Sequence, residues 1–366
     1  MRNCIPVHSI LSRAPVRSSA GLPFPWRRRA ETAAVAAVGV ALFLVLHLPL
    51  PFLFGPLFAC LAAALAHRPL MGFGAVGVAA RTILGVAVGA SITPEVVARL
   101  PQMAASVCFV PLYIAAIGAV GLPFFHRICG FDRVTAWYAA MPGGLQDMVI
   151  FGTEAGGDVR ALSLVHATRV LVIVTLAPAI LTLGFGAPLG NAVGAPAATL
   201  PAEEMALMAA AALIGWKGGE RIGLFGASIL GPMIAAAVLS LAGFIHARPP
   251  AEAILFAQYM IGVALGVGYV GVTMAEIRRV VLAGVAFVVI LATLAAAVTE
   301  AVVQLGLAPP VEGFLAFAPG GQAEMTVLAL VAGADLGFVI VHHLTRIVLV
   351  IVGAPLVARL VLGRQP

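Results

Sequence analysis

Two stretches of this 366-residue chain match each other without a gap, in a register that pairs Pro142 with Pro319. The first reads PGGLQDMVIFGTEAGGDVRALSLVHATRVLVIVTLAP from Pro142, and the second reads PGGQAEMTVLALVAGADLGFVIVHHLTRIVLVIVGAP from Pro319. Their identical positions include Pro, Gly, Asp, His, Thr and Arg, whereas chance matches in an apolar chain would fall on Ala, Leu and Val. The chain is therefore an internal duplication, and each half is expected to repeat the fold of the other.

The duplication extends upstream of both stretches. GVAVG at 85–89 matches GVALG at 262–266 in the same register, which we call the repeat register. Gly55-Pro56 matches Gly231-Pro232 with an offset that is one residue shorter than the repeat register. We therefore divide the chain into a polar tail over 1–30, which we expect to be cytoplasmic and disordered, a first membrane repeat over 31–190 and a second over 200–362.

Composition places these repeats in a membrane. Hydrophobic residues make up 62% of the chain and charged residues 10%, and the mean hydropathy is +1.09. A soluble domain carries about 25% charged residues, so the sequence predicts an all-α polytopic membrane protein with room for roughly ten crossings. The expected apolar segments are 31–50, 52–67, 76–92, 101–123, 133–156 and 159–184, followed by 203–218, 224–244, 253–272, 280–306, 311–333 and 336–362.

Positive charge at the segment ends distinguishes parallel from inverted halves. If every apolar segment spans the membrane, Arg160, Lys217 and Arg221 lie outside, against the positive-inside rule. If each Pro-Gly-Gly segment enters and returns on one side, only Arg99 and Arg248 among the loop charges stay outside. We therefore expect two inverted repeats of about five transmembrane helices each, with both termini cytoplasmic. The alternative to each re-entrant hairpin is one broken helix that spans.

Two Pro-Gly-Gly triplets, Pro142-Gly143-Gly144 and Pro319-Gly320-Gly321, are expected to interrupt helices. Proline removes a hydrogen-bond donor and clashes with the preceding turn, while glycine permits close backbone approach. A packing kink would explain one such break. Its recurrence at the same place in both halves favours a substrate site at mid-membrane, where inverted-repeat transporters carry broken helices.

Four polar residues lie in the first turn after the breaks: Gln146, Asp147, Gln322 and Glu324. The helix dipole favours a carboxylate there for structural reasons alone. A carboxylate inside the membrane is also costly, which makes Asp147 and Glu324 candidate ligands of a coupling proton or sodium ion. The two glutamines are candidate substrate ligands.

Arg169 and Arg346 lie inside long aliphatic segments, where a charged arginine costs at least about 2.5 kcal/mol. Each must therefore face the protein interior and have a partner. His166 and His343 precede the arginines by three positions and share their helical face, so they join the candidate coupling-ion residues.

Two explanations are open for the arginines. They can pair with nearby carboxylates and lock each hairpin to a helix, or they can bind an anionic substrate through their guanidinium groups. The pair of arginines together with both broken helices favours the second explanation. The carboxylates considered for the first are Asp147 and Asp158, with their counterparts Glu324 and Asp335.

Arg81 and Gln258 occupy matching positions in the repeat register, each on an otherwise apolar segment. Because the position is polar in both halves, the two residues are secondary candidates for the site. The neighbouring Gly-xxx-Gly pairs are more simply explained by close helix packing.

The two PGG-x-x-[DE]-M segments and the His-x-Thr-Arg turns at 166–169 and 343–346 resemble the AbrB family of bacterial inner-membrane proteins, which is marked by an internal duplication. The resemblance covers about 31–362 and implies a location in the bacterial inner membrane. It also brings two labels, regulator of gene expression and ammonia monooxygenase. In fold, the family resembles inverted-repeat cation antiporters and anion transporters.

The residues give little support to either label in its direct sense. A copper or iron centre needs clustered His and carboxylate ligands, and here each candidate histidine lies near an arginine that would repel a metal cation. Direct contact with DNA would need a soluble binding domain, for which the sequence leaves no room.

The sequence therefore predicts a secondary transporter of a small anionic solute, coupled to a proton or sodium gradient. The alternative is a membrane-bound regulator that acts on gene expression indirectly. We expect no enzymatic activity, cofactor, bound metal or direct nucleic-acid partner. The expected partners are the lipid bilayer and the solute. Whether the chain forms a homodimer is left open by the sequence.

Overall fold

The computed structural model describes residues 25–48, 50–98, 100–187, 189, 194–224 and 226–361, and all regular secondary structure in these ranges is helical. The first half contains α1 (Pro25–Val45), α2 (Pro51–Leu65), α3 (Ala75–Gly89), α4 (Pro94–Ala98), α5 (Leu100–Val107), α6 (Phe109–Pro123), η2 (Phe124–Ile128), α7 (Arg133–Ala140), α8 (Leu145–Glu154), α9 (Val159–Ala179) and η3 (Ile180–Gly184). After η4 (Ala197–Thr199), the second contains α10 (Ala202–Arg221), α11 (Ala227–Leu241), α12 (Ala251–Val267), α13 (Met274–Glu276), η5 (Ile277–Val281), α14 (Leu282–Gln304), α15 (Pro310–Phe317), α16 (Gln322–Ala332) and α17 (Leu336–Val361).

Within the described ranges, four helices are long and apolar enough to cross a membrane: Pro101–Ile128, Val159–Gly184, Met274–Gln304 and Leu336–Ala358. Four shorter apolar helices, α2, α3, α11 and α12, contain 15 to 17 residues. The helices and the apolar composition together identify a polytopic, all-helical membrane protein. The number of crossings and the sidedness of the termini stay predictions.

A polar tail is expected over residues 1–30. Residues 1–24 lie outside the described residues, whereas residues 25–30 form the start of α1. Pro25 occupies the first helical position, where its fixed φ suits the helix and its missing N–H costs no hydrogen bond. The helix therefore begins ahead of the apolar segment expected from 31.

The helices of the two halves correspond in order and length. α7 and α15 contain 8 residues each, and their first residues, Arg133 and Pro310, match in the repeat register. α2 and α11 contain 15 residues each and include the matched Gly-Pro pairs. The same correspondence joins α1 to α10, α3 to α12, α8 to α16 and α9 to α17. The matched sequences thus form matched series of helices.

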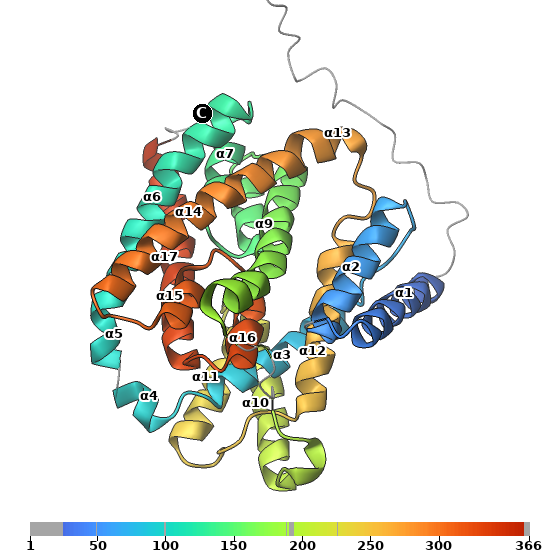
Figure 1. Cartoon of the computed structure of the whole chain (residues 1–366), viewed down its shortest axis with the longest axis vertical. Helices are drawn as coiled ribbons and strands as arrows, with labels where there is room; N and C mark the ends of the chain where they lie inside the picture. The colour runs from blue at the N-terminus through green and yellow to red at the C-terminus, as the bar shows by residue number, and fades with distance from the viewer. Residues whose placement is uncertain are drawn as a thin grey trace, which may run out of the picture.

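These helices pack in two groups (Figure 1). The scaffold group contains α1, α2, α3, α10, α11 and α12, of which α1, α2 and α12 lie at the right of the view. The hairpin group contains α6–α9 and α14–α17. The groups meet where α3 packs against α16, and a shared core that includes Leu57, Val174 and Val339 fills the contact.

Glycines bring neighbouring scaffold helices into close contact. A Cβ on Gly55 of α2 would lie 2.6 Å from the backbone of Gly39 on α1, and a Cβ on Gly215 of α10 would overlap the carbonyl of Gly231 on α11. A larger residue at any of these four positions would force the helices apart, which explains a glycine at both members of each pair.

A second set of glycines interlocks the halves. Gly85 and Gly89 of α3 lie against the backbone of α11, whereas Gly262 and Gly266 of α12 lie against the backbone of α2. The third helix of each half therefore packs on the second helix of the other half. This exchange places Arg81 and Gln258, which are carried by α3 and α12, inside one shared scaffold.

Candidate functional site

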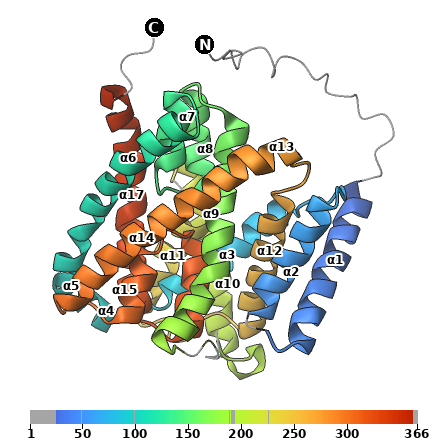
Figure 2. The same cartoon turned by 45° about the horizontal axis from the view of Figure 1, so that its top comes forward.

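Each Pro-Gly-Gly break joins two short helices that fold back on one another. The N–H of Asp158, after α8, donates to Oγ1 of Thr135 in the first turn of α7 over 2.8 Å. At the matching place in the second half, the N–H of Asp335 donates to Oε1 of Glu312 in the first turn of α15 over 3.3 Å. In each half the first helix therefore starts beside the end of the second, as in a hairpin. Figure 2 shows α7 and α8 at the upper end of the molecule and α15 near the lower end.

The tips of both hairpins consist of extended backbone. Met141 follows α7 with ψ of 132°, and Gly144 precedes α8 with ψ of 145°. The corresponding residues of the second half, Ala318 and Gly321, have ψ of 129° and 151°. The helices therefore stop and restart across each triplet, which leaves their terminal carbonyl and N–H groups without helical partners.

The middle glycine of each triplet packs closely against a methionine side chain. A Cβ on Gly143 would lie 2.7 Å from the methyl carbon of Met148, and one on Gly320 would lie 2.6 Å from that of Met325. Both methionines are fully buried. The recurring PGG-x-x-[DE]-M pattern thus corresponds to a tip whose backbone packs against the methionine of the same pattern.

Arg169 and Arg346 hold the two tips through backbone carbonyls. In each half Nη1 bonds the carbonyl just after the first hairpin helix, and Nη2 bonds the carbonyl of the middle glycine. The bonds are Arg169 Nη1 to Met141 O at 3.1 Å, Arg169 Nη2 to Gly143 O at 2.6 Å, Arg346 Nη1 to Ala318 O at 2.8 Å and Arg346 Nη2 to Gly320 O at 2.8 Å. Each guanidinium therefore acts as a clasp between a hairpin and the long helix that follows it.

Neither arginine forms an ion pair with a carboxylate in the described part of the chain. No ion pair of the described residues joins either arginine to Asp147, Asp158, Glu324 or Asp335, the carboxylates that the first explanation considered. Asp158 instead accepts from the N–H groups of Arg160 and Ala161 at the start of α9, and Asp335 accepts from Phe338 N–H at 3.2 Å. The broken helix itself supplies buried carbonyls, and the planar guanidinium fork fits two of them at once.

The histidines form a second matched pair of contacts. Nε2 of His166 lies 3.0 Å from the carbonyl of Tyr138, and Nε2 of His343 lies 2.8 Å from that of Leu315. Because a carbonyl only accepts, Nε2 carries the hydrogen in both rings. The long helices α9 and α17 are therefore each bonded to a hairpin at two places. The arginine bonds the tip, and the histidine bonds a carbonyl one turn before the tip.

The two candidate coupling-ion carboxylates lie at the tips. Asp147 and Glu324 occupy the third position of α8 and α16, and the two residues are only 8% and 9% exposed. The positive ends of both helix dipoles face these carboxylates. Glu324 folds back against Gly321 and interacts electrostatically with Arg81 of the scaffold and Arg169 of the hairpin group.

Two glutamines are further polar residues of the candidate site. Gln258 of α12 is 1% exposed, and neither its side-chain nitrogen nor that of Gln322 has a hydrogen-bond partner in the described part of the chain. The side chain of Gln146 lies outside the described residues.

Sequence reasoning did not single out Tyr113 of α6. It is 1% exposed, and its ring lies edge-on to Phe317, with ring centroids 6.0 Å apart. Its hydroxyl has no partner among the described residues. No signal was present in the sequence, since the matching position in the repeat register is Ile290 and the surrounding segment is apolar.

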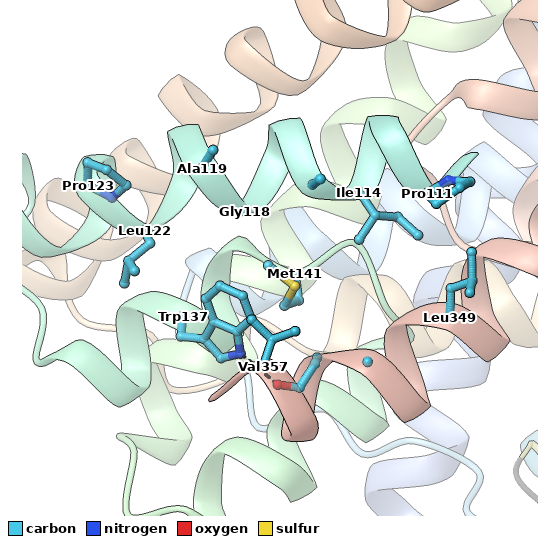
Figure 3. Close-up of a pocket in the computed structure, with 13 residues that line it drawn as sticks. Pro111, Ile114, Gly118, Ala119, Leu122, Pro123, Trp137, Met141, Leu349 and Val357 are labelled. Atoms are coloured by element: carbon cyan, nitrogen blue, oxygen red, sulfur yellow. Dashed lines mark hydrogen bonds between the residues drawn. The ribbon is translucent and has the colours of Figure 1, made fainter. Parts of the chain in front are cut away.

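An apolar cavity of about 570 Å³ lies beside the first tip, between α6 and α17. Figure 3 shows Trp137 and Met141 pointing into it from the first hairpin. The indole N–H of Trp137 is already bonded to the carbonyl of Ala354 at 3.0 Å. The cavity therefore offers no free polar group to a charged solute.

A polar cavity of about 430 Å³ lies between the scaffold group and the hairpin group, where α15 begins and α16 ends. Arg248 and Ser91 of the scaffold line one side, and Arg248 Nε donates to Ser91 Oγ at 3.1 Å. Glu312 and residues 333–337 line the other side.

The described residues contain no group of three or more His, Cys, Asp or Glu side chains placed to hold a metal ion. The expectation of no resident metal stays a prediction.

Comparison with known proteins identifies the family. The model of the family described as Transition state regulatory protein AbrB matches residues 52–362. The chain belongs to the AbrB family. Within it, the chain is 23% identical over 329 residues to "Putative regulator AbrB" of Escherichia coli (strain K12), which covers 88% of this chain and 93% of that protein. It is also 25% identical over 291 residues to the uncharacterized protein YhjN of Bacillus subtilis (strain 168), which covers 75% of each chain.

The AbrB match spans both hairpins, both clasps and most of the scaffold. The resemblance that the two PGG segments and His-x-Thr-Arg turns predicted is thus confirmed.

Proposed function

We propose that this AbrB-family protein is a secondary transporter that moves a small anionic solute, driven by a proton or sodium gradient. The observation that carries the proposal is the pair of broken, clasped hairpins, which match contact for contact in the repeat register. A buried break in a membrane helix requires dedicated polar partners, and transporters with inverted repeats place such breaks around their substrate.

An inverted arrangement of the halves supports this function. The two hairpins lie at opposite ends of the molecule, and α1 begins at the same end as that where α17 finishes (Figure 2). Ten crossings are an even number, and a re-entrant hairpin returns to the side from which it entered. This topology therefore requires both chain ends on one side of the membrane. The positively charged residues Arg160, Arg278 and Arg279 lie near that end, which we assign to the cytoplasm of a bacterial inner-membrane protein.

The charges near the tips favour an anion. Three arginines, Arg81, Arg169 and Arg346, accompany the two carboxylates Asp147 and Glu324. The N-termini of α8 and α16 add partial positive charge at the same place. The solute then meets positive groups from both hairpins, while the carboxylates carry the coupling ion.

A difference between the two ends of the molecule supports a cycle of alternating exposure. At the α7–α8 end, Arg160 Nε donates to Glu276 Oε1 at 2.7 Å, and Arg160 Nη2 donates to the carbonyl of Gly271 at 3.0 Å. At the other end Gly337 occupies the position that corresponds to Arg160, and it lines the polar cavity beside Arg248. We assign the structure to a state closed at the cytoplasmic end and open toward the outside.

Uptake by proteoliposomes tests the proposal. The purified chain should accumulate at least one radiolabelled mono- or dicarboxylate when a proton or sodium gradient is imposed, compared with protein-free vesicles. Asp147→Asn and Glu324→Gln should abolish the gradient dependence but leave solute exchange, whereas Glu300→Gln on the exposed end of α14 should change neither. No gradient-driven uptake of any carboxylate in the wild type would contradict transport.

The printed names of the family and of the Escherichia coli relative favour a second candidate, a membrane-bound regulator of gene expression that acts through a partner protein. Deleting residues 2–25 separates the two. Loss of a transcriptional response with uptake intact would support regulation through the N-terminal segment, whereas an intact response would remove that segment as its docking site.

A further inference from the structure

Several buried hydrogen-bond donors near the tips have no partner in the described part of the chain, and three of them are Nε of Arg169, Nε of Arg346 and the hydroxyl of Tyr113. The three residues are 3%, 4% and 1% exposed, so bulk water does not reach them. Buried donors are almost always satisfied in folded proteins, and three unsatisfied donors together point to a ligand that accepts hydrogen bonds.

Tyr113 lies on α6, which packs against residues next to both clasps. Its ring lies edge-on to Phe317, which directly precedes the carbonyl that Arg346 holds. Further along α6, a Cβ on Gly118 would lie 3.0 Å from the methyl carbon of Met141, whose carbonyl Arg169 holds. One helix therefore runs past both tips.

The charges around Tyr113 are alike in sign. Arg169 and Arg346 interact electrostatically with each other, and Tyr113 interacts with both. Neither guanidinium forms an ion pair with a carboxylate among the described residues, and both use their Nη atoms on carbonyls. The carboxylate of Glu324 interacts with Arg169 only beyond ion-pair distance. Two buried positive charges repel each other, and a negative group bound close to both offsets that repulsion.

We propose that Tyr113 and the Nε groups of Arg169 and Arg346 form a binding site for a single anionic group. The ligand is a halide ion or the carboxylate of a small solute, and the site rests on the anion transport proposed above. Because Ile290 replaces tyrosine at the repeat-related position, the site uses both halves but is completed by one residue of the first.

Anion-dependent stability of the full-length protein tests the site. The unfolding temperature of purified protein in detergent is measured while sodium chloride or sodium acetate replaces sodium methanesulfonate at constant ionic strength. An anion that binds the folded state raises the midpoint, and the stabilisation grows as RT ln(1 + c/Kd), where c is the anion concentration. Tyr113→Phe removes only the hydroxyl, and the loss of one hydrogen bond to a charged group should weaken the apparent Kd by about 10- to 100-fold. Tyr259→Phe is the matched control, because the Tyr259 hydroxyl bonds the carbonyl of Ala33 in the scaffold.

A response to chloride alone identifies a halide site, and a response to acetate identifies a carboxylate site. Anion-independent unfolding of the wild type, or an unchanged apparent Kd in Tyr113→Phe, would overturn the proposal. These outcomes are separate from the transport test: anion binding without solute uptake removes the transporter, whereas uptake with normal anion affinity in Tyr113→Phe removes only this site.

Discussion

At the scale of single residues, the two buried arginines satisfy backbone carbonyls that the broken helices expose. A membrane offers these carbonyls no water, so a hairpin tip at mid-membrane needs donors from the protein. Arg169 and Arg346 each supply two, at matching positions and to matching acceptors. The remaining Nε of each guanidinium has no partner among the described residues, and the anion site proposed above assigns it to a ligand.

Replacing Arg346 by Gln should destabilise the protein. The change breaks two hydrogen bonds from a charged donor and leaves the carbonyls of Ala318 and Gly320 buried without partners, a loss of about 2 kcal/mol or more. Thermal unfolding in detergent measures it. Arg68→Gln is the control, because Arg68 forms an exposed ion pair with Glu31 worth less than about 1 kcal/mol. Equal shifts in the two variants would contradict the clasp.

At the scale of elements, the sequence predicts some features and not others. Pro-Gly-Gly breaks the helices wherever it occurs in a long apolar segment, so the helix pairs α7–α8 and α15–α16 follow from local chemistry. The acceptors of Arg169 do not, because a sequence does not tell which backbone carbonyls fold toward a side chain. Tyr113 was missed because its contact with Phe317 of the second hairpin arises only through long-range packing. The exchange of α3 and α12 between halves is likewise a tertiary property.

Gly215→Ala should weaken the contact between α10 and α11. An added Cβ would overlap the backbone of Gly231, and overpacking of this kind costs about 1–3 kcal/mol. Gly218→Ala on the same helix is the control, since a Cβ there meets nothing within 4 Å and alanine favours the helix. The two unfolding temperatures should therefore shift in opposite directions. A loss no larger in Gly215→Ala than in Gly218→Ala would show that the helices do not pack through this glycine.

At the scale of the whole molecule, Arg160 bonds Glu276 and Gly271 at one end, while the polar cavity beside Arg248 lies at the other. In the proposed transport cycle, the Arg160 contact closes its end. The exposed ion pair is weak by itself, so it can open during a transport cycle without a large energetic cost. Movement of the hairpin group against the scaffold group would exchange the two states.

Holding this end closed should stop transport. With the native cysteines replaced, Arg160→Cys and Glu276→Cys are joined by a thiol cross-linker that a reductant cleaves. Uptake should fall to the protein-free level after cross-linking and return on reduction, because the cycle needs this contact to open. Each single-cysteine variant serves as its control. Full uptake in the cross-linked protein would remove the contact as a gate.

The central claim is that the two hairpins enter from opposite faces of the membrane, and labelling of their first residues tests it most directly. Arg133 and Pro310 are the matching first residues of α7 and α15, and both are exposed. In a background without native cysteines, Arg133→Cys should react with a membrane-impermeant thiol reagent only in inside-out vesicles, and Pro310→Cys only in intact cells. Reaction of both cysteines from the same side would contradict the inverted arrangement and the transport site built on it.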